Sequence, residues 1–155
     1  MRNELMMVAE PGHRKTVDPR PILSKPSAAE KYLREYFADS AVEECYALTL
    51  DAKMRAIGTY LVSRGTAICS LIEPREIFRK AVLDCACKVI VAHNHPSGDP
   101  LPSAEDIRIT RRLFMAGEIL GIELVDHLII GTSPQAISNG YSSLAELGYI
   151  DNGKN

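Results

Sequence analysis

Two histidines and an aspartate lie close together in the sequence, at a spacing suited to binding a metal ion. On an extended backbone, side chains at positions i and i+2 point to the same side. His93 and His95 can therefore both reach one ion, while Asn94 faces away. The apolar run 89–92 just before them is typical of a buried strand, so the histidines should lie where that strand enters a loop.

Asp106 completes the predicted site from the first turn of a helix. Ser103 and Asp106 have the S-x-x-D spacing of a capping box, and the loop before them, rich in proline and glycine, can turn the helix back over the histidines. Two imidazoles and one carboxylate leave a fourth tetrahedral position for water, as in catalytic zinc sites. The sequence therefore predicts that Zn²⁺ is bound by His93, His95 and Asp106.

A hydrolytic zinc site also needs a general base and a group that stabilises the oxyanion. Zinc lowers the pKa of its water to about 7, but a side chain must still take the proton. Glu44, at the start of the predicted strand 45–50, is the candidate base, and its neighbour Glu43 is the competitor. Ser103 can donate a hydrogen bond to the oxyanion, although the capping box alone would account for this residue.

The remaining polar residues have simpler interpretations. Asp126 and His127 are neighbours in a predicted strand and point to opposite faces, so we expect both to be structural. His13 should be exposed. The cysteines should be reduced and mostly buried, because the one close pair has C-x-C spacing rather than the wider spacing of a zinc site; they are Cys45, Cys69, Cys85 and Cys87.

Composition and charge indicate a globular protein. The 155 residues are 46% hydrophobic and 25% charged, which is typical of one domain with its own core. A net charge of −2 gives no strong overall attraction to nucleic acid or to an anionic membrane. Neither a signal peptide nor an apolar run long enough to span a bilayer is evident, so a cytoplasmic location is expected.

The pattern along the chain predicts an α/β fold with a mixed β-sheet sandwiched by helices. Residues 1–26 are interrupted by prolines and should form a flexible arm, residues 27–150 a single domain, and residues 151–155 a tail. The expected strands are 45–50, 54–62, 66–71, 89–92, 122–130 and 136–138. The expected helices are 27–39, 74–85 with Val82 and Leu83 inward, 103–120 ended by Gly121, and 142–147.

These motifs resemble those of a known superfamily. H-x-H followed by S-x-x-D, here His93, His95, Ser103 and Asp106, is similar to the signature of the JAMM metalloproteases. The chain most resembles the bacterial RadC-like branch of that superfamily. The supporting segments are Glu73-Pro74-Arg75-Glu76-Ile77-Phe78, Ala92-His93-Asn94-His95-Pro96-Ser97-Gly98 and Asp126-His127-Leu128-Ile129-Ile130-Gly131.

The resemblance implies a cytidine-deaminase-like JAB/MPN fold and cleavage of a peptide or isopeptide bond in a protein substrate. It implies zinc on the three predicted ligands, Ser103 as oxyanion donor, and Glu44 rather than Glu43 as base. Longer RadC-like proteins carry a helix-hairpin-helix module, for which residues 1–26 are too short and too rich in proline. The alternative function is an accessory protein of DNA repair that binds DNA and holds a structural metal, with a modest basic patch at Arg108, Arg111 and Arg112.

Overall fold

The chain folds into one five-stranded sheet with helices on both faces. A computed structural model describes residues 18–65, 72–132 and 140–151. The strands are β1 (Glu44–Leu50), β2 (Ala56–Arg64), β3 (Lys88–His95), β4 (Glu123–Gly131) and β5 (Tyr141–Ser143). The helices are α1 (Pro26–Arg34), the 3₁₀ helix η1 (Glu35–Phe37), α2 (Pro74–Leu83) and α3 (Ala104–Leu120).

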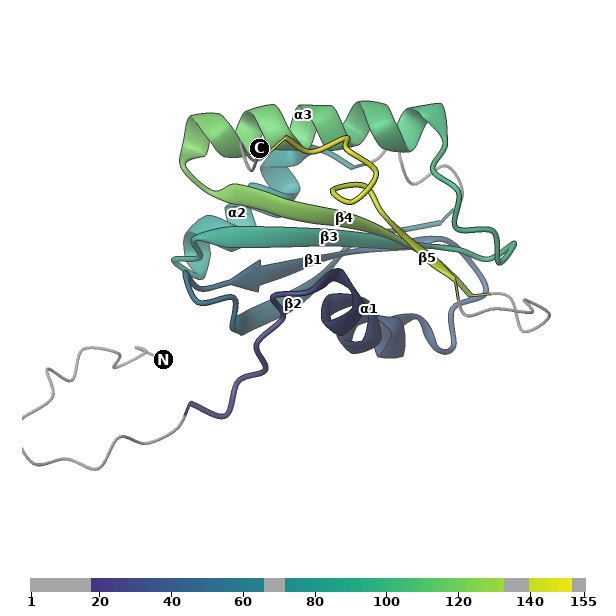
Figure 1. Cartoon of the computed structure of the whole chain (residues 1–155), viewed down its shortest axis with the longest axis horizontal. Coiled ribbons are helices and arrows are strands. Elements are labelled where there is room, and N and C mark those ends of the chain that lie inside the picture. Colours follow the sequence, from purple (N-terminus) through teal and green to yellow (C-terminus); the bar gives the residue numbers. More distant parts are fainter. Residues whose placement is uncertain (1–17, 66–71, 133–139, 152–155) are drawn as a thin grey trace, which may run out of the picture.

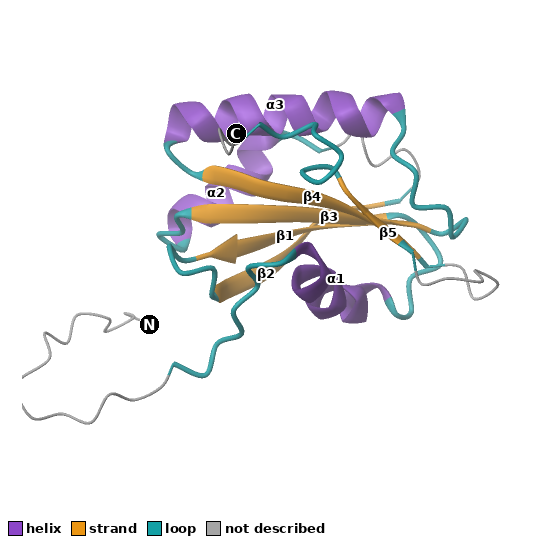
Figure 2. Cartoon of the chain, in the orientation of Figure 1, coloured by secondary structure: helices purple, strands orange, loops and turns teal. Residues whose placement is uncertain are grey.

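The sheet is mixed, as the sequence predicts. Its strand order is β2-β1-β3-β4-β5. β1 is antiparallel to β2 and to β3, β3 and β4 are parallel, and β5 is antiparallel to β4. Helix α3 makes the crossover from β3 to its parallel neighbour, as such a connection requires. Figures 1 and 2 show α2 and α3 on one face of the sheet and α1 on the other.

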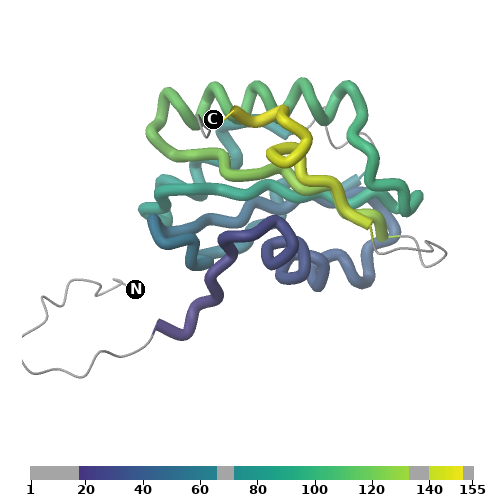
Figure 3. The backbone as a smooth tube through the Cα atoms, in the orientation of Figure 1, coloured from purple at the N-terminus to yellow at the C-terminus, as the bar shows by residue number. Residues whose placement is uncertain are grey.

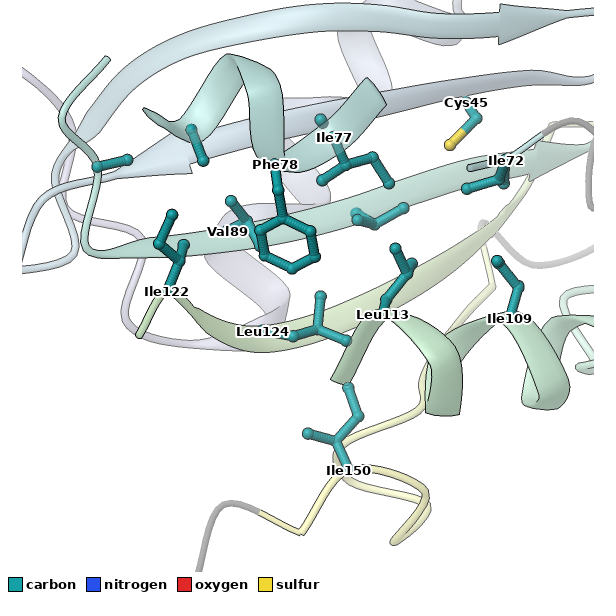
Figure 4. Close-up of a cluster of buried hydrophobic side chains, with 14 residues drawn as sticks. Cys45, Ile72, Ile77, Phe78, Val89, Ile109, Leu113, Ile122, Leu124 and Ile150 are labelled. Carbon is teal, nitrogen blue, oxygen red and sulfur yellow. The ribbon is translucent and has the colours of Figure 1, made fainter. Parts of the chain in front are cut away.

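Alternation along the central strands divides the core into two layers. Val89 and Val91 of β3 pack on the side of α2 and α3, whereas Ile90 and Ala92 pack on the side of α1. In the first layer, Phe78 of α2 points toward the sheet (Figure 4). Because β3 is covered on both faces, its middle residues 89–92 are all apolar, and the polar residues at its end need specific partners.

Part of the predicted arm is held against the sheet. The sequence assigned residues 1–26 to a flexible arm, but residues 18–25 run beside the β1–β2 turn before entering α1 (Figure 3). The backbone N–H of Leu23 donates to the carbonyl of Met54 at 2.8 Å. The Leu23 side chain is buried in the layer beneath α1, which anchors this segment.

The structure corrects the sequence reading at three places. The predicted helix 142–147 is instead β5 followed by turns. Helix α2 ends at Leu83, and Val82 and Leu83 are 58% and 68% exposed rather than inward. Of the cysteines within the described residues, Cys45 is buried but Cys85 and Cys87 are exposed.

Some predictions lie outside the described residues: His13, Cys69 and the strands 66–71 and 136–138. Among the helices that the structure describes, none combines the length and the apolar character needed to cross a membrane.

The surroundings of Gly117 show how closely α3 lies against the start of β4, and a substitution there can test this contact. A Cβ atom at this position would lie 2.5 Å from the Ile122 carbonyl oxygen and 3.3 Å from Phe78 Cζ. Alanine normally stabilises a helix interior relative to glycine by about 1 kcal/mol. We expect Gly117→Ala to reverse that sign and to lower the free energy of unfolding by about 1–3 kcal/mol, because the added methyl group overpacks the contact.

Urea denaturation of the full chain measures this effect. Glu118→Ala, at the exposed neighbouring position, is the matched control and should change stability by a few tenths of a kcal/mol, since its propensity is close to that of alanine. A Gly117→Ala protein as stable as the parent would mean that α3 does not lie this close to the β4 segment.

Candidate metal centre

The three predicted ligands come together where β3 ends and α3 begins. One ligand atom from each of His93, His95 and Asp106 lies within 4.8 Å of the others. His93 and His95 end the central strand β3, and Asp106 lies in the first turn of the helix that follows. His93 and Asp106 are fully buried, whereas the His95 side chain is 18% exposed, so solvent reaches the cluster from the His95 side.

The spacing of the ligand atoms fits a small tetrahedral ion. His93 Nε2 is 3.1 Å from His95 Nε2 and 3.2 Å from Asp106 Oδ1, and His95 Nε2 is 3.7 Å from Asp106 Oδ2. Ligands held about 2.0–2.1 Å from a tetrahedral zinc ion are separated from one another by about 3.3 Å. These separations are compatible with zinc bound by one nitrogen of each histidine and one carboxylate oxygen of Asp106.

A turn after β3 orients His95. Its Nδ1 lies 2.8 Å from the carbonyl oxygen of Asp99, which can only accept, so Nδ1 carries the hydrogen and Nε2 presents its lone pair to the cluster. The turn closes with a bond from the Gly98 N–H to the His95 carbonyl, and Gly98 has a φ of 87°, which favours glycine. This is a local reason for the glycine in the loop.

The capping box orients Asp106. Both the backbone N–H and the hydroxyl of Ser103 donate to Asp106 Oδ2 at 2.7 Å, and the Asp106 N–H donates to Ser103 Oγ at 3.1 Å. The buried carboxylate thus lies at the N-terminus of α3, where the helix dipole stabilises negative charge. Ser103, predicted as an oxyanion donor, lies beside the cluster and here bonds to one of its ligands.

Cys45 lies on the same face of the sheet without joining the cluster. It pairs with His93 across β1 and β3, and its side chain belongs to the layer beneath α2 and α3. Burial, and secondarily the Asp106 carboxylate, raise the pKa of this thiol well above its usual range. Among the described residues, the group of candidate ligand atoms that lie close together is formed by His93, His95 and Asp106, without Cys45.

His127 belongs to this site, which sequence reasoning missed. As predicted, it points to the opposite face from Asp126, but that face is the one that carries the cluster. Its Nε2 lies 2.9 Å from Nδ1 of His93, and its Nδ1 lies 2.6 Å from Oγ1 of Thr110. The signal available in the sequence was its position on a second buried strand, since parallel strands joined by one helix are often neighbours.

Asp126 has the structural role that the sequence predicts. Its carboxylate accepts hydrogen bonds from the Ser143 hydroxyl at 2.6 Å and from the Ala145 N–H at 3.1 Å. These contacts fasten β5 and the turn after it to β4. Burial raises the pKa of Asp126 to about 6, against these hydrogen bonds, which lower it.

Asn94 fixes the backbone that carries the two candidate bases. Its Oδ1 accepts from the Glu44 N–H at 2.7 Å, and its Nδ2 donates to the Val42 carbonyl at 3.1 Å. The amide thus holds both sides of Glu43. The Glu44 carboxylate contacts Arg64 Nε at 3.1 Å and, at 3.4 Å, the hydroxyl of Tyr46.

Comparison with known proteins identifies the family. The sequence matches the RadC-like JAB domain over residues 23–149. The chain belongs to this family. One relative, UPF0758 protein STH371 of Symbiobacterium thermophilum, is 44% identical over 128 residues, which cover 83% of this chain and 52% of that protein.

Two further relatives also match most of this chain over only about half of their own length. A UPF0758 protein of Geobacillus thermodenitrificans is 40% identical over 138 residues, covering 89% of this chain and 58% of its own. A UPF0758 protein of Clostridium botulinum is 50% identical over 101 residues, covering 65% and 42%. This RadC-like chain therefore spans about half the length of the relatives it matches. The resemblance predicted from the motifs is confirmed, and the α/β fold agrees with a JAB domain.

The burial of His127 predicts a dependence of stability on pH. Burial, together with neighbouring His93, lowers the pKa of His127 from 6.5 to about 3 in the folded chain. The unfolded chain binds a proton near pH 6.5 and the folded chain does not, so stability is full above pH 6.5 and falls as the pH drops. Between pH 7 and pH 5 this loss is about 2 kcal/mol.

Urea denaturation of zinc-free protein at the two pH values, with His127→Gln as comparison, measures the effect. The parent should lose about 2 kcal/mol more than the variant, whose amide does not titrate. Asp126 acts in the opposite sense over the same interval, but it is present in both proteins and cancels in the difference. Equal losses in the two proteins would refute a neutral His127.

Proposed function

We propose that this RadC-like chain is a zinc-dependent hydrolase of the metallopeptidase type, acting on a peptide or isopeptide bond of a protein substrate. The observation that carries the proposal is the convergence of two imidazole nitrogens and one carboxylate at tetrahedral spacing, partly open on one side. Three protein ligands with a vacant fourth position are typical of catalytic rather than structural zinc.

The protein supplies orientation and proton transfer around this ion. When bound, zinc lowers the pKa of a water molecule and polarises the carbonyl that is attacked. His95 and Asp106 are held by the Asp99 carbonyl and the Ser103 cap, so the ligand atoms are already oriented. The Ser103 hydroxyl is the proposed oxyanion donor, and it must turn from Asp106 Oδ2 to act in this way.

The choice between Glu43 and Glu44 as general base depends on which face of β1 each side chain lies on. Cys45 and His93 are paired on the face that carries the metal ligands. Glu44 alternates with Cys45, and its carboxylate lies with Tyr46, which packs in the layer beneath α1. Glu43 immediately precedes β1 and lies two residues before Cys45, so strand alternation favours the face of the cluster for its side chain.

These contacts support Glu43 as the base in preference to Glu44, the residue predicted from the sequence. Glu43 is half-buried, so solvent reaches it, as it reaches His95. Its backbone is held by the amide of Asn94 and by a bond from the Gly65 N–H to its carbonyl at 2.9 Å. A proton taken from water at this carboxylate can then be passed to the leaving amine.

The DNA-binding alternative rests on the predicted basic patch of α3, and ion pairs weaken that patch. Arg108 pairs with Glu105 one turn away on the helix, and Arg112 pairs with Glu73 at 3.3 Å. The guanidinium charges are thus partly compensated before any phosphate could bind. We therefore favour the hydrolase over an accessory role in DNA repair.

Hydrolysis by the zinc-loaded full chain tests this function. Protein stripped of metal and reloaded with one equivalent of zinc is incubated with a library of peptides and ubiquitin-like isopeptide substrates. We expect cleavage that is lost on chelation and in His95→Ala. Zinc binding without cleavage of any library member, in a protein that remains folded, would contradict the hydrolase and leave a metal-binding module.

A matched pair of isosteric variants separates the two candidate bases. Glu43→Gln should lower kcat by about 10²–10⁴-fold with zinc affinity unchanged, because general-base catalysis contributes a factor of this size. Glu44→Gln, which keeps the length of the side chain and loses only the ion pair with exposed Arg64, should retain most of the activity. The reverse outcome would restore Glu44 as the base.

A further inference from the structure

A series of short hydrogen bonds starts at Nδ1 of His93, on the side of the imidazole ring opposite the other candidate ligands. His93 Nδ1 meets His127 Nε2 at 2.9 Å, and His127 Nδ1 meets Thr110 Oγ1 at 2.6 Å. Thr110 Oγ1 in turn lies 2.6 Å from the backbone carbonyl oxygen of Asp106. The chain thus begins at one metal ligand and ends on the backbone of another.

The carbonyl at the end of the chain fixes the direction of every bond in it. A carbonyl oxygen only accepts, so the single hydroxyl hydrogen of Thr110 is donated to Asp106. Thr110 Oγ1 must then accept from His127, which places a hydrogen on His127 Nδ1. His127 is fully buried and its two ring nitrogens face His93 and Thr110 rather than a carboxylate, so a neutral ring fits this position and its Nε2 is left to accept. The donor to it can only be Nδ1 of His93.

We propose that His127 and Thr110 are positioning residues that hold His93 in the Nδ1–H tautomer, with the Nε2 lone pair directed at the metal site. This inference rests on the proposed function, because it gives these hydrogen bonds a role in metal binding. His95 obtains the same tautomer directly from the Asp99 carbonyl. His93 is buried within the sheet and obtains it through two intermediate residues.

The arrangement explains why a second histidine, rather than a carboxylate, lies behind the first. All four groups of the chain are buried, so an unpaired donor or acceptor among them would be costly. A neutral imidazole accepts at one nitrogen and donates at the other, so it transmits the polarity set by a distant carbonyl without adding charge. Partners of this kind behind ligating histidines fix the tautomer and the orientation of the ring.

Removal of the Thr110 hydroxyl should allow His93 to adopt the other tautomer. In Thr110→Val, His127 keeps His93 as a partner but loses the acceptor for its Nδ1 hydrogen. The hydrogen bond between the two histidines can then reverse its direction, so that His127 Nε2 donates to His93 Nδ1. The hydrogen of His93 is then on Nε2, where it blocks the lone pair that would bind the metal. Thr110→Ser keeps a hydroxyl at the same place and should preserve the original direction.

Two measurements on the full chain test the proposal. Long-range proton–nitrogen NMR correlations of zinc-free, ¹⁵N-labelled protein report the tautomer of each of its four histidines. We expect Nδ1–H for His93 and His127 in the parent and a mixture of tautomers in Thr110→Val. Competition with a chromophoric chelator should show zinc affinity lowered about 10- to 100-fold in Thr110→Val and close to the parent value in Thr110→Ser.

Thr49→Val is the matched control. Thr49 is equally buried, and its hydroxyl is hydrogen-bonded to Gly58 and Asp84, away from the cluster. The control should lose stability and keep its zinc affinity. An Nε2–H tautomer for His93 in the zinc-free parent, or equal zinc affinities of Thr110→Val and Thr49→Val, would overturn the proposal. A parent that binds no zinc would instead refute the proposed function, while the NMR result still decides the tautomer.

Discussion

The structure depends on one constraint, which is that a central strand covered on both faces ends in three polar residues. His93 and Asn94 are fully buried and His95 is half-buried, and each has hydrogen-bond partners. Buried polar groups without partners would cost the fold several kcal/mol. The elements around the end of β3 supply hydrogen-bond partners for these residues, and the partners differ between the two faces of the strand.

On one face, the partners form the candidate metal centre. α3 brings Asp106 and Thr110, and β4 brings His127, so the crossover that makes the sheet parallel also supplies a ligand and the groups behind His93. On the other face, Asn94 uses its amide to hold the backbone on both sides of Glu43. The end of β3 thus positions the candidate ligands and, through Asn94, the backbone on either side of Glu43.

The sequence predicted the cluster of candidate ligands because their positions follow from local rules. The i, i+2 spacing on a strand and the capping box on a helix define His93, His95 and Asp106 without knowledge of the sheet. His127 and the roles of Glu43 and Glu44 depend on strand order and register, which no local pattern contains. The error at 142–147 has a similar cause, since the short strand there forms only because β4 offers an edge to pair with.

The identity of the atoms that bind the ion decides whether His93, His95 and Asp106 form a zinc site. X-ray absorption at the zinc edge, on the full chain loaded with one equivalent of zinc, reports which atoms surround the ion and at what distance. We expect two imidazole nitrogens and two oxygens at about 2.0–2.1 Å. Sulfur at about 2.3 Å, or an oxygen shell without imidazole, would contradict a zinc site formed by His93, His95 and Asp106.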